Sequence, residues 1–303
     1  MEFSNSALSR LNRRLKGCFH RDATLRDFID EDYFWSGQGF RGKLSIEVGS
    51  CFDIDEDILL EIALFSELLH NASLIHDDII DQDSERRGRK TIWKKYGTDK
   101  ALLLGDLLIG KAFEVASCAR VANSVKVQWL STISKTVTEA VRGALNELEF
   151  NFSDDDEVLS RYHRMADQKT GVMFTLPIRC LGHAAGMSLK EIESLSGMFS
   201  KLAVAYQIRD DHADFFSLKK GRVSSSDIMN GRPNLYHLLS TSSDHSLDFV
   251  DHVLSFQENL IHRAMDELTK FPSSLSDVVN ELVLPFVRLK AVPDSYPSLA
   301  QST

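Results

Sequence analysis

Two short segments of the chain carry the same acidic pattern. Residues 74–81 read LIHDDIID and residues 207–214 read QIRDDHAD, so each contains Asp-Asp-x-x-Asp. Aspartates four positions apart share a helix face, where like charges repel unless a cation compensates them. Carboxylate oxygens suit Mg²⁺, which commonly bridges one or two carboxylates to the phosphates of a substrate. The pattern predicts a site for magnesium and a diphosphate, with the carboxylates of Asp77, Asp78, Asp81, Asp210, Asp211 and Asp214.

Basic side chains lie near both acidic segments in the sequence. Arg86 and Arg87 follow the first segment, and Lys169 interrupts an otherwise apolar stretch. The stretch after the second segment carries Lys219, Lys220 and Arg222. Each is ordinary for a solvated surface when taken alone, but fixed cations beside carboxylates and metal ions would together hold a polyanion. The acidic run 154–157, by contrast, lies in a polar stretch and is expected to be solvated surface.

The segments that must position these residues are predicted to be helical. The chain has six prolines and none before Pro177, which leaves long uninterrupted segments. Apolar residues recur at steps of three and four through 55–81, and Ser188–Glu191 reads as a capping box for a helix that continues to about Phe216. Further helices are expected at 99–122, 124–150, 156–182, 244–270 and 274–291, with a loop at 217–234 and a frayed tail at 292–303. We predict one all-α domain over residues 1–303.

The composition limits the class of protein. The chain has 303 residues, 43% of them hydrophobic and 26% charged, which fits a soluble globular protein. A net charge of −9 disfavours general binding of nucleic acid. The four cysteines are far apart and form no CxxC, so neither a zinc cage nor a disulfide framework is expected. Without an apolar leader or an 18-residue apolar run, we expect no integral membrane segment and a cytoplasmic location.

Five segments in order resemble the trans-isoprenyl diphosphate synthases, the polyprenyl synthetase family. They read ELLHNASLIHDDIIDQDSERRGRKT (67–91), GDLL (105–108), DQKTGVMF (167–174), YQIRDDHADFF (206–216) and SDIMNGRPNLY (226–236). The resemblance implies the isoprenoid synthase fold, a helical bundle around a deep central cavity, in a homodimer. It also implies three Mg²⁺ ions and head-to-tail prenyl transfer. In that reaction an allylic prenyl diphosphate ionises, C4 of isopentenyl diphosphate attacks the cation, and a proton is lost.

The resemblance also assigns roles to residues. The expected direct metal ligands are Asp77, Asp81 and Asp210, with Asp78 and Asp214 behind them. The residues expected to hold the allylic diphosphate are Arg86, Lys169, Arg222 and Arg232. Those expected to hold isopentenyl diphosphate are Arg41, Lys43, His70 and Arg87. The residues expected beside the reacting carbons are Lys169, Thr170 and Gln207. His76 is instead expected to be structural, hydrogen-bonded within a pair of helices.

One stretch departs from the family pattern. The family signature Gly-Gly-Lys-Arg-x-Arg-Pro supplies a Lys and an Arg that hold isopentenyl diphosphate, whereas residues 37–44 read GQGFRGKL. Phe40 then stands at the Lys position and Lys43 at the second Arg position, while Arg41 is retained. Lys and Arg are not equivalent in binding a phosphate by two hydrogen bonds. The departure concerns the acceptor site and leaves the allylic site complete.

Product length is expected to depend on two small residues. In this family, bulky aromatics four and five positions before the first Asp pair shorten the product. Ser73 and Ala72 occupy those positions, which favours a product of twenty carbons or more, with fifteen as the alternative.

Three other functions are compatible with parts of the sequence. The altered stretch 37–44 would suit a terpene-synthase-like enzyme that ionises a prenyl diphosphate without elongating it. A non-catalytic subunit of a heteromeric synthase would have little reason to keep both acidic segments. A metal phosphohydrolase interpretation uses His70, His76 and Asp77 but ignores the second segment. A chain-elongating synthase accounts for the most residues.

Overall fold

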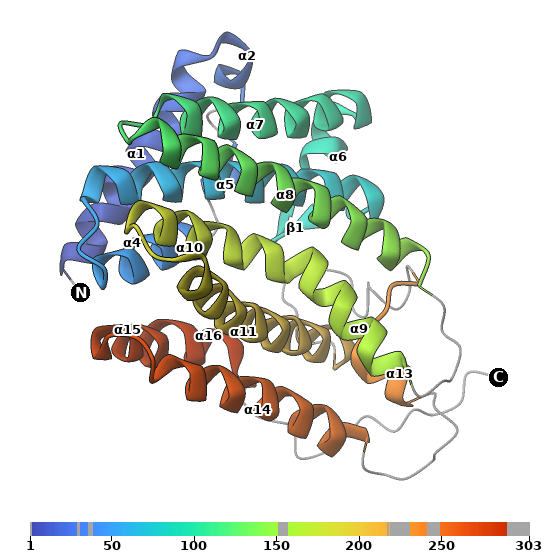
Figure 1. The fold of residues 1–303 in the computed structure, drawn as a ribbon. Coiled ribbons are helices and arrows are strands. Elements are labelled where there is room, and N and C mark those ends of the chain that lie inside the picture. The colour runs from blue at the N-terminus through green and yellow to red at the C-terminus, as the bar shows by residue number, and fades with distance from the viewer. Residues whose placement is uncertain are drawn as a thin grey trace.

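The computed structural model describes residues 2–28, 31–35, 39–150, 157–216, 218, 231–240 and 249–289 (Figure 1). The regular elements are α1 (Glu2–Arg21), α2 (Ala23–Arg26), α3 (Asp32–Trp35), α4 (Phe40–Ser50), α5 (Glu56–Ile80), β1 (Glu85–Arg86), β2 (Arg89–Lys90), α6 (Ile92–Tyr96), α7 (Thr98–Cys118), α8 (Asn123–Leu148), α9 (Val158–Ala166), η1 (Asp167–Gly171), α10 (Val172–Ala184), α11 (Leu189–Phe215), α13 (Leu235–Ser240), α14 (Phe249–Leu268), α15 (Ser273–Val278), η2 (Val279–Val283) and α16 (Leu284–Val287). Within the described ranges, strands occur only in the β1–β2 hairpin. The predicted all-α fold is confirmed.

Helix α5 is the central helix of the bundle. It packs against α7, α4, α10 and α1 (Figure 1), and fourteen of its residues are buried. In the described part of the chain, α5 alone is long and apolar enough to cross a membrane, and 72% of its most apolar window is buried inside the protein. That burial is what a core helix of a globular protein requires, because its apolar surface is already covered by neighbouring helices.

The predicted capping box starts helix α11. The Ser188 hydroxyl accepts a hydrogen bond from the Glu191 N–H, and the Glu191 carboxylate accepts one from the Ser188 N–H at 2.8 Å. The helix then runs for 27 residues and packs against α10 and α14. It carries the second acidic segment at its C-terminal end, and α5 carries the first at its own C-terminal end. Both segments are therefore placed by long buried helices.

The segment predicted as one helix over 156–182 contains a π-helical turn. Helix α9 leads into η1 and then into α10, so the chain stays helical from Val158 to Ala184. The turn carries one residue more than a regular α-helical turn, a feature often found at functional sites. Pro177 lies inside α10 without ending it. The extra residue falls at Asp167–Gly171, which holds Lys169 and Thr170.

His76 connects helices α5 and α7, as predicted. Its Nε2 lies 3.2 Å from the Leu102 carbonyl oxygen and 3.6 Å from the Asp106 carboxylate. A Cβ atom at Gly105 would come within 2.2 Å of the same nitrogen, so glycine is needed for the two helices to approach this closely. The histidine is thus a structural residue that holds the two helices together.

The sequence patterns did not reveal the N-terminal helices. Helix α1 contributes the buried side chains of Leu11, Leu15 and Phe19 to the core, and α4 follows Gly39, whose φ of 55° suits glycine. Several predictions concern residues outside the described ranges: the solvated acidic run 154–156, most of the loop 217–234 with Arg222, and the tail 292–303. The prediction of one domain stays a prediction.

Candidate active site

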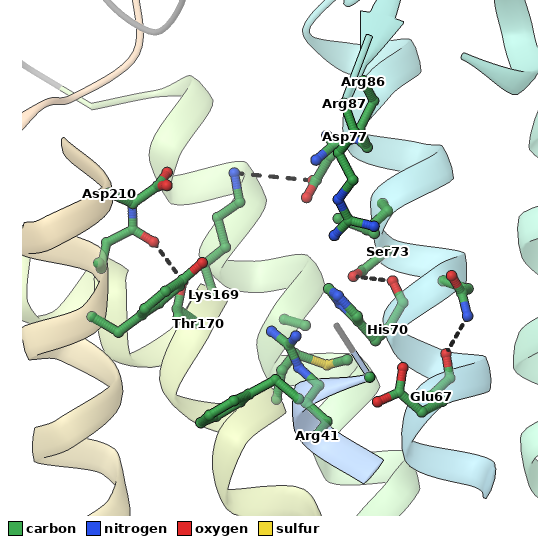
Figure 2. A pocket seen from close by; sticks show the side chains of 18 of the residues that line it. Arg41, Glu67, His70, Ser73, Asp77, Arg86, Arg87, Lys169, Thr170 and Asp210 are labelled. Carbon is green, nitrogen blue, oxygen red and sulfur yellow. Dashed lines mark hydrogen bonds and ion pairs between the residues drawn. The ribbon is translucent and has the colours of Figure 1, made fainter. Parts of the chain in front are cut away.

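One cavity of about 580 Å³ brings together most of the residues selected from the sequence. Its wall is built by the C-terminal half of α5, the β1–β2 hairpin, α8, η1, the end of α11, and residues of α4 and α16. Figure 2 shows Asp77 and Lys169 pointing toward one another, Asp210 on the opposite wall, and Arg41 and His70 farther along the cavity. We refer to Asp77, Asp81 and Asp210 as the carboxylate end, and to Arg41, Arg87 and His70 as the guanidinium end.

The two acidic segments face the same cavity from opposite walls. Asp77 on α5, Asp81 at its C-terminal cap and Asp210 on α11 all line it, although Asp81 and Asp210 are far apart in the chain. Burial and the nearby Asp77 carboxylate raise the pKa of Asp81, because both favour its neutral form. A cation bound between the two walls would relieve this repulsion.

The middle aspartate of each segment anchors its helix end. Asp78 is 1% exposed and accepts hydrogen bonds from the Tyr33 hydroxyl at 2.7 Å and from Arg86 Nε at 2.7 Å. Asp211 accepts 2.7 Å and 2.8 Å hydrogen bonds from the Tyr162 hydroxyl and the Leu235 N–H. Both carboxylates are therefore engaged by the protein itself.

Three predicted metal carboxylates are not directed into the cavity as free ligands. Asp78 and Asp214 do not line it, and Asp214 is 1% exposed. Asp211 borders it, but its two oxygens accept protein hydrogen bonds, including one of 2.9 Å from Gln207 Nε2. For Asp78 and Asp211 the physical reason is the helical period, which turns the second residue of each pair by about 100° away from the first. The structure supports Asp77, Asp81 and Asp210 as the ligand-facing set.

Lys169 lies between the two acidic walls. Its Nζ is 2.6 Å from Glu147 Oε2 and 4.0 Å from Asp77 Oδ1. Burial alone would lower the pKa of Lys169, but the carboxylates of Asp77 and Glu147 outweigh it and raise that pKa. The lysine is therefore a fixed cation. A Cβ at Gly143 would come within 2.7 Å of the Lys169 backbone nitrogen, so this glycine lets α8 approach η1 closely.

Two arginines sit against the first acidic segment. Arg232 Nε donates a 2.8 Å hydrogen bond to Asp81, and its second nitrogen lies 3.3 Å from the Ile80 carbonyl. Arg86 forms an ion pair of 2.6 Å with Asp78. Both arginines line the cavity, as the sequence predicted. Arg222 lies outside the described residues.

Thr170 and Gln207 meet at the centre of the cavity wall. The Thr170 hydroxyl donates a 2.7 Å hydrogen bond to Gln207 Oε1, which joins η1 to α11. Both residues line the cavity next to Lys169 and Asp210. Thr170, Gln207 and Lys169 were predicted together, and the structure brings them together.

The guanidinium end contains buried polar atoms without partners. Arg41 Nε and His70 Nδ1 are buried and make no hydrogen bond to any residue that the structure describes. Burial, followed by the charges of Arg41 and Arg87, holds the pKa of His70 well below its usual range, so its imidazole is neutral near pH 7. Burial also lowers the pKa of Arg87, and the Arg86 charge adds to this effect. Concentrated positive charge and unused donors make this end suitable for an anion.

The residues of the altered stretch 37–44 differ in whether they reach the cavity. Arg41 and Phe40 line the cavity, whereas Lys43 does not. Lys43 follows them on α4, and the helical turn carries its side chain past the cavity wall. The geometry therefore does not support Lys43 as a ligand for isopentenyl diphosphate. Phe40 instead stacks on Phe286, with ring centroids 3.8 Å apart.

The two small residues of the chain-length prediction also differ in position, because one lines the cavity and the other does not. Ser73 lines the cavity and donates a 2.9 Å hydrogen bond to the His70 carbonyl. Ala72 is 1% exposed and does not line it. Only Ser73 can limit the cavity directly, since Ala72 lies one helical step away on α5.

The carboxylate end fits magnesium by its donor chemistry. In the described ranges, no three His, Cys, Asp or Glu side chains converge closely enough to hold an ion on their own. Mg²⁺ usually needs only one or two carboxylates when substrate phosphates and water complete its octahedron. Asp77, Asp81 and Asp210 supply hard oxygen donors of that kind on facing walls. They would hold the metal together with a diphosphate rather than before it.

Comparison with known sequences supports the family that the motifs resemble. The family model for polyprenyl synthetase matches residues 23–268. A short chain isoprenyl diphosphate synthase of Methanocaldococcus jannaschii is 31% identical over 246 residues, 80% of this chain and 74% of that protein. A geranylgeranyl diphosphate synthase of Methanosarcina mazei is 32% identical over 58% of this chain and 55% of its own.

A solved structure shares the fold. A polyprenyl synthase from Caulobacter crescentus superposes with a TM-score of 0.81 over 96% of this chain and 97% of its own, at 20% identity. The match of the family model over residues 23–268 shows that the chain belongs to the polyprenyl synthetase family. It is a prenyltransferase.

Several residues that shape the site have no motif that marks them in the sequence. Glu147 pairs with Lys169, Tyr33 and Tyr162 hold the middle aspartates, and Glu67 accepts a 2.7 Å hydrogen bond from the Gly42 N–H. Glu67 is 7% exposed although it carries a carboxyl group. A buried acid on an apolar helix was a usable signal for Glu67. Nothing in the local sequence marks the two tyrosines, because their partners are 45 and 49 residues away.

Proposed function

We propose that this protein elongates prenyl chains by condensing an allylic prenyl diphosphate head-to-tail with isopentenyl diphosphate. The observation that carries the proposal is the placement of Asp77, Asp210 and Lys169 on facing walls of one cavity (Figure 2). The names of the relatives, a short chain isoprenyl diphosphate synthase and a geranylgeranyl diphosphate synthase, support it. Elongation also explains why the cavity has both a carboxylate end and a guanidinium end.

The carboxylate end would bind the allylic diphosphate and assist its ionisation. Negative charge develops on the leaving diphosphate, and fixed cations aimed at that charge stabilise the transition state. Lys169 and Arg232 can supply such charge from the cavity wall, and Arg86 supports the same wall through Asp78. Asp77, Asp81 and Asp210 would hold Mg²⁺, three ions by family resemblance, and the metal supplies further positive charge to the diphosphate.

The guanidinium end would bind isopentenyl diphosphate. Arg41 and Arg87 offer fixed charge, and His70 offers a neutral imidazole with an unpartnered nitrogen. The acceptor carbon would then face the cation near Thr170 and Gln207, whose 2.7 Å hydrogen bond fixes the wall there. The departing diphosphate would take the proton that is lost. Burial of this end keeps water away from the cation.

Product length would depend on the wall at Ser73. Its small side chain leaves space beside α5, which supports a product of twenty carbons or more. Ser73→Phe should shorten the main product by at least one isoprene unit, as measured by chromatography of the dephosphorylated products. An unchanged length would exclude Ser73 from the tunnel that receives the growing chain.

The assembly would be a homodimer formed through α7 and α8. These neighbouring helices expose large apolar side chains, an unusual concentration for a surface meant for water. They are Leu102, Leu103, Val141, Leu145 and Leu148. Light scattering coupled to gel filtration should give twice the 34.2 kDa chain mass. Leu103→Glu with Leu145→Glu should give the monomer mass, and a monomeric wild type would contradict the assembly.

One assay tests the proposed function. Purified protein is incubated with Mg²⁺, labelled isopentenyl diphosphate and allylic diphosphates of increasing length, and label in a longer diphosphate is measured. Asp77→Ala and Asp210→Ala should each lower incorporation about 100-fold or more, because each removes a ligand-facing carboxylate. Asp266→Ala, an exposed aspartate on α14, is the matched control. Near-normal turnover in either cavity variant would contradict the assignment, provided circular dichroism shows unchanged helix content.

A further inference from the structure

The guanidinium end of the cavity has part of its positive charge offset by the protein itself. Arg41 and Arg87 supply fixed charge there, and the buried carboxyl group of Glu67 lies close enough to interact with both. The altered stretch 37–44 adds little, since Arg41 lines the cavity and Lys43 does not. A diphosphate carries several negative charges, and charges taken out of water must be paired. A further cation at this end would therefore strengthen its hold on an acceptor diphosphate.

Arg209 is a half-buried cation of α11 that lines the same cavity. It directly precedes Asp210 and lies one helical turn after Tyr206, so it shares a helix face with the tyrosine. Tyr206 also lines the cavity, and it lies close enough to Arg41 and Arg87 to interact electrostatically with both. The face of α11 that carries Arg209 is therefore turned toward the guanidinium end.

Packed aromatic rings connect Arg209 with Arg41. The Arg209 guanidinium carbon lies 5.5 Å from the centre of the Phe286 ring. The Arg41 guanidinium carbon lies 5.2 Å from the centre of the Phe174 ring. Phe40 contacts both of these rings, with centroid distances of 3.8 Å to Phe286 and 5.6 Å to Phe174. Both guanidinium groups are thus held by one set of rings through cation–π contacts.

Arg209 is fixed by the fold but keeps hydrogen-bond donors for a ligand. Its guanidinium donates to the Phe286 carbonyl, and this group has further N–H donors. Gln257 Nε2 donates hydrogen bonds to the carbonyls of Ala205 and Val287, at 2.8 Å and 3.1 Å, which hold α16 against α11. In the described part of the chain, no carboxylate forms an ion pair with Arg209. A bound anion can therefore take the remaining donors.

We propose that Arg209 binds the acceptor diphosphate together with Arg41 and Arg87 and supplies the positive charge that the altered stretch 37–44 lacks. The inference rests on the proposed function and adds a residue to its acceptor site. The three arginines reach the cavity from α11, α4 and the turn of the β1–β2 hairpin, so they approach an anion from different elements. Guanidinium groups suit this role because their planar donors match phosphate oxygens.

Steady-state kinetics of the full chain with Mg²⁺, farnesyl diphosphate and labelled isopentenyl diphosphate test the role of the charge. Arg209→Gln keeps an N–H donor but loses the charge, and it should raise the KM for isopentenyl diphosphate about fivefold or more. The KM for farnesyl diphosphate should change less than about twofold, because that substrate is assigned to the carboxylate end. Arg209→Lys keeps the charge and should restore most of the affinity. Arg263→Gln, at an exposed arginine of α14, is the matched control.

Direct binding separates this inference from the proposed function. Equilibrium dialysis with labelled isopentenyl diphosphate should show weaker binding to Arg209→Gln and a shallower salt dependence than in the wild type, since one charge contact is lost. Circular dichroism checks the fold, and Arg209→Leu, which can still pack on the Phe286 ring, is the second variant.

The possible outcomes distinguish the two proposals. Elongation by the wild type with an unchanged KM for isopentenyl diphosphate in the folded Arg209 variants overturns this inference alone. Equal increases in both KM values, or an Arg209→Lys variant as impaired as Arg209→Gln, also overturn it, because they indicate a structural role. Weaker binding in the variants without elongation by the wild type overturns the proposed function alone. A wild type that neither binds nor elongates with isopentenyl diphosphate overturns both.

Discussion

The two ends of the cavity differ in how their charges are satisfied. At the carboxylate end, Lys169 pairs with Glu147 at 2.6 Å and Arg232 with Asp81 at 2.8 Å. At the guanidinium end, Arg41 Nε and His70 Nδ1 are buried without hydrogen bonds to the described part of the chain. A carboxylate and a cation can hold one another until a substrate and metal arrive. Unpartnered polar atoms need the ligand itself to satisfy them.

This difference indicates which end can change without loss of the fold. The carboxylate end is tied to buried anchors, since Tyr33 and Tyr162 hold the middle aspartates from other helices. A change there disturbs both packing and charge. The guanidinium end depends mainly on single side chains at the wall, so Phe40 can replace a cation and still pack against Phe286. The departure from the family pattern is found at this second end.

The largest expected effect is at the carboxylate end. Lys169→Met should lower the rate of prenyl transfer about 10²- to 10³-fold, because a fixed cation beside the leaving diphosphate is lost. Steady-state incorporation of labelled isopentenyl diphosphate measures it. Lys201→Met, which breaks an ion pair with Glu267 away from the cavity, is the control. A loss of less than threefold would remove Lys169 from the diphosphate site.

The guanidinium end should respond in substrate affinity. Arg87→Met should raise the KM for isopentenyl diphosphate about tenfold, since one charged hydrogen-bond donor to the anion is lost. The KM for the allylic diphosphate should change less than twofold if the two ends act separately. Arg89→Met in the neighbouring strand β2 is the control. Equal increases in both KM values would break the distinction between the ends.

The buried anchors should contribute to stability. Tyr33→Phe and Tyr162→Phe each leave a buried aspartate short of one hydrogen bond, which costs about 1–3 kcal/mol of unfolding free energy. Urea denaturation followed by circular dichroism measures this. Similar losses would show that the two acidic segments are anchored in equivalent ways. A loss in only one variant would show that the two anchors differ in strength.

The smallest effect is a pH dependence carried by His70. Its folded pKa lies well below the ordinary 6.5, so the unfolded chain binds a proton first as the pH falls. Stability should therefore decrease on acidification, by about 1 kcal/mol from this residue per pH unit below 6.5. Urea titrations of wild type and His70→Gln at pH 6.5 and at one pH unit below it isolate the contribution. An identical pH dependence in the two proteins would contradict the buried neutral state.

The helices were predictable from the sequence where periodicity and caps were strong. Ser188 with Glu191 marked the start of α11 correctly, and the pattern over 55–81 located α5. Asp77, Asp210 and Lys169 were found because motifs preserve both residue type and spacing. The first turns of α4 were missed because the helix mixes glycine, serine and apolar residues with no clear amphipathic face.

Other parts of the site depend on contacts between distant residues. The engagement of Asp78 and Asp211 by tyrosines could not be foreseen, since a motif does not show which of its carboxylates faces the cavity. The exclusion of Lys43 from the wall depends on how α4 is rotated against α5. The stacking of Phe40 on Phe286 joins residues from opposite ends of the chain.

The π-helical turn at Asp167–Gly171 makes this site sensitive to insertions and deletions. Deleting one residue there would restore regular α-helical hydrogen bonding but would rotate one flank against the other by about 100°. Lys169 and Thr170 could then no longer face Asp77 and Gln207 while α10 kept its packing against α11. Evolution and protein engineering can therefore exchange side chains within this turn, but they must conserve its residue count.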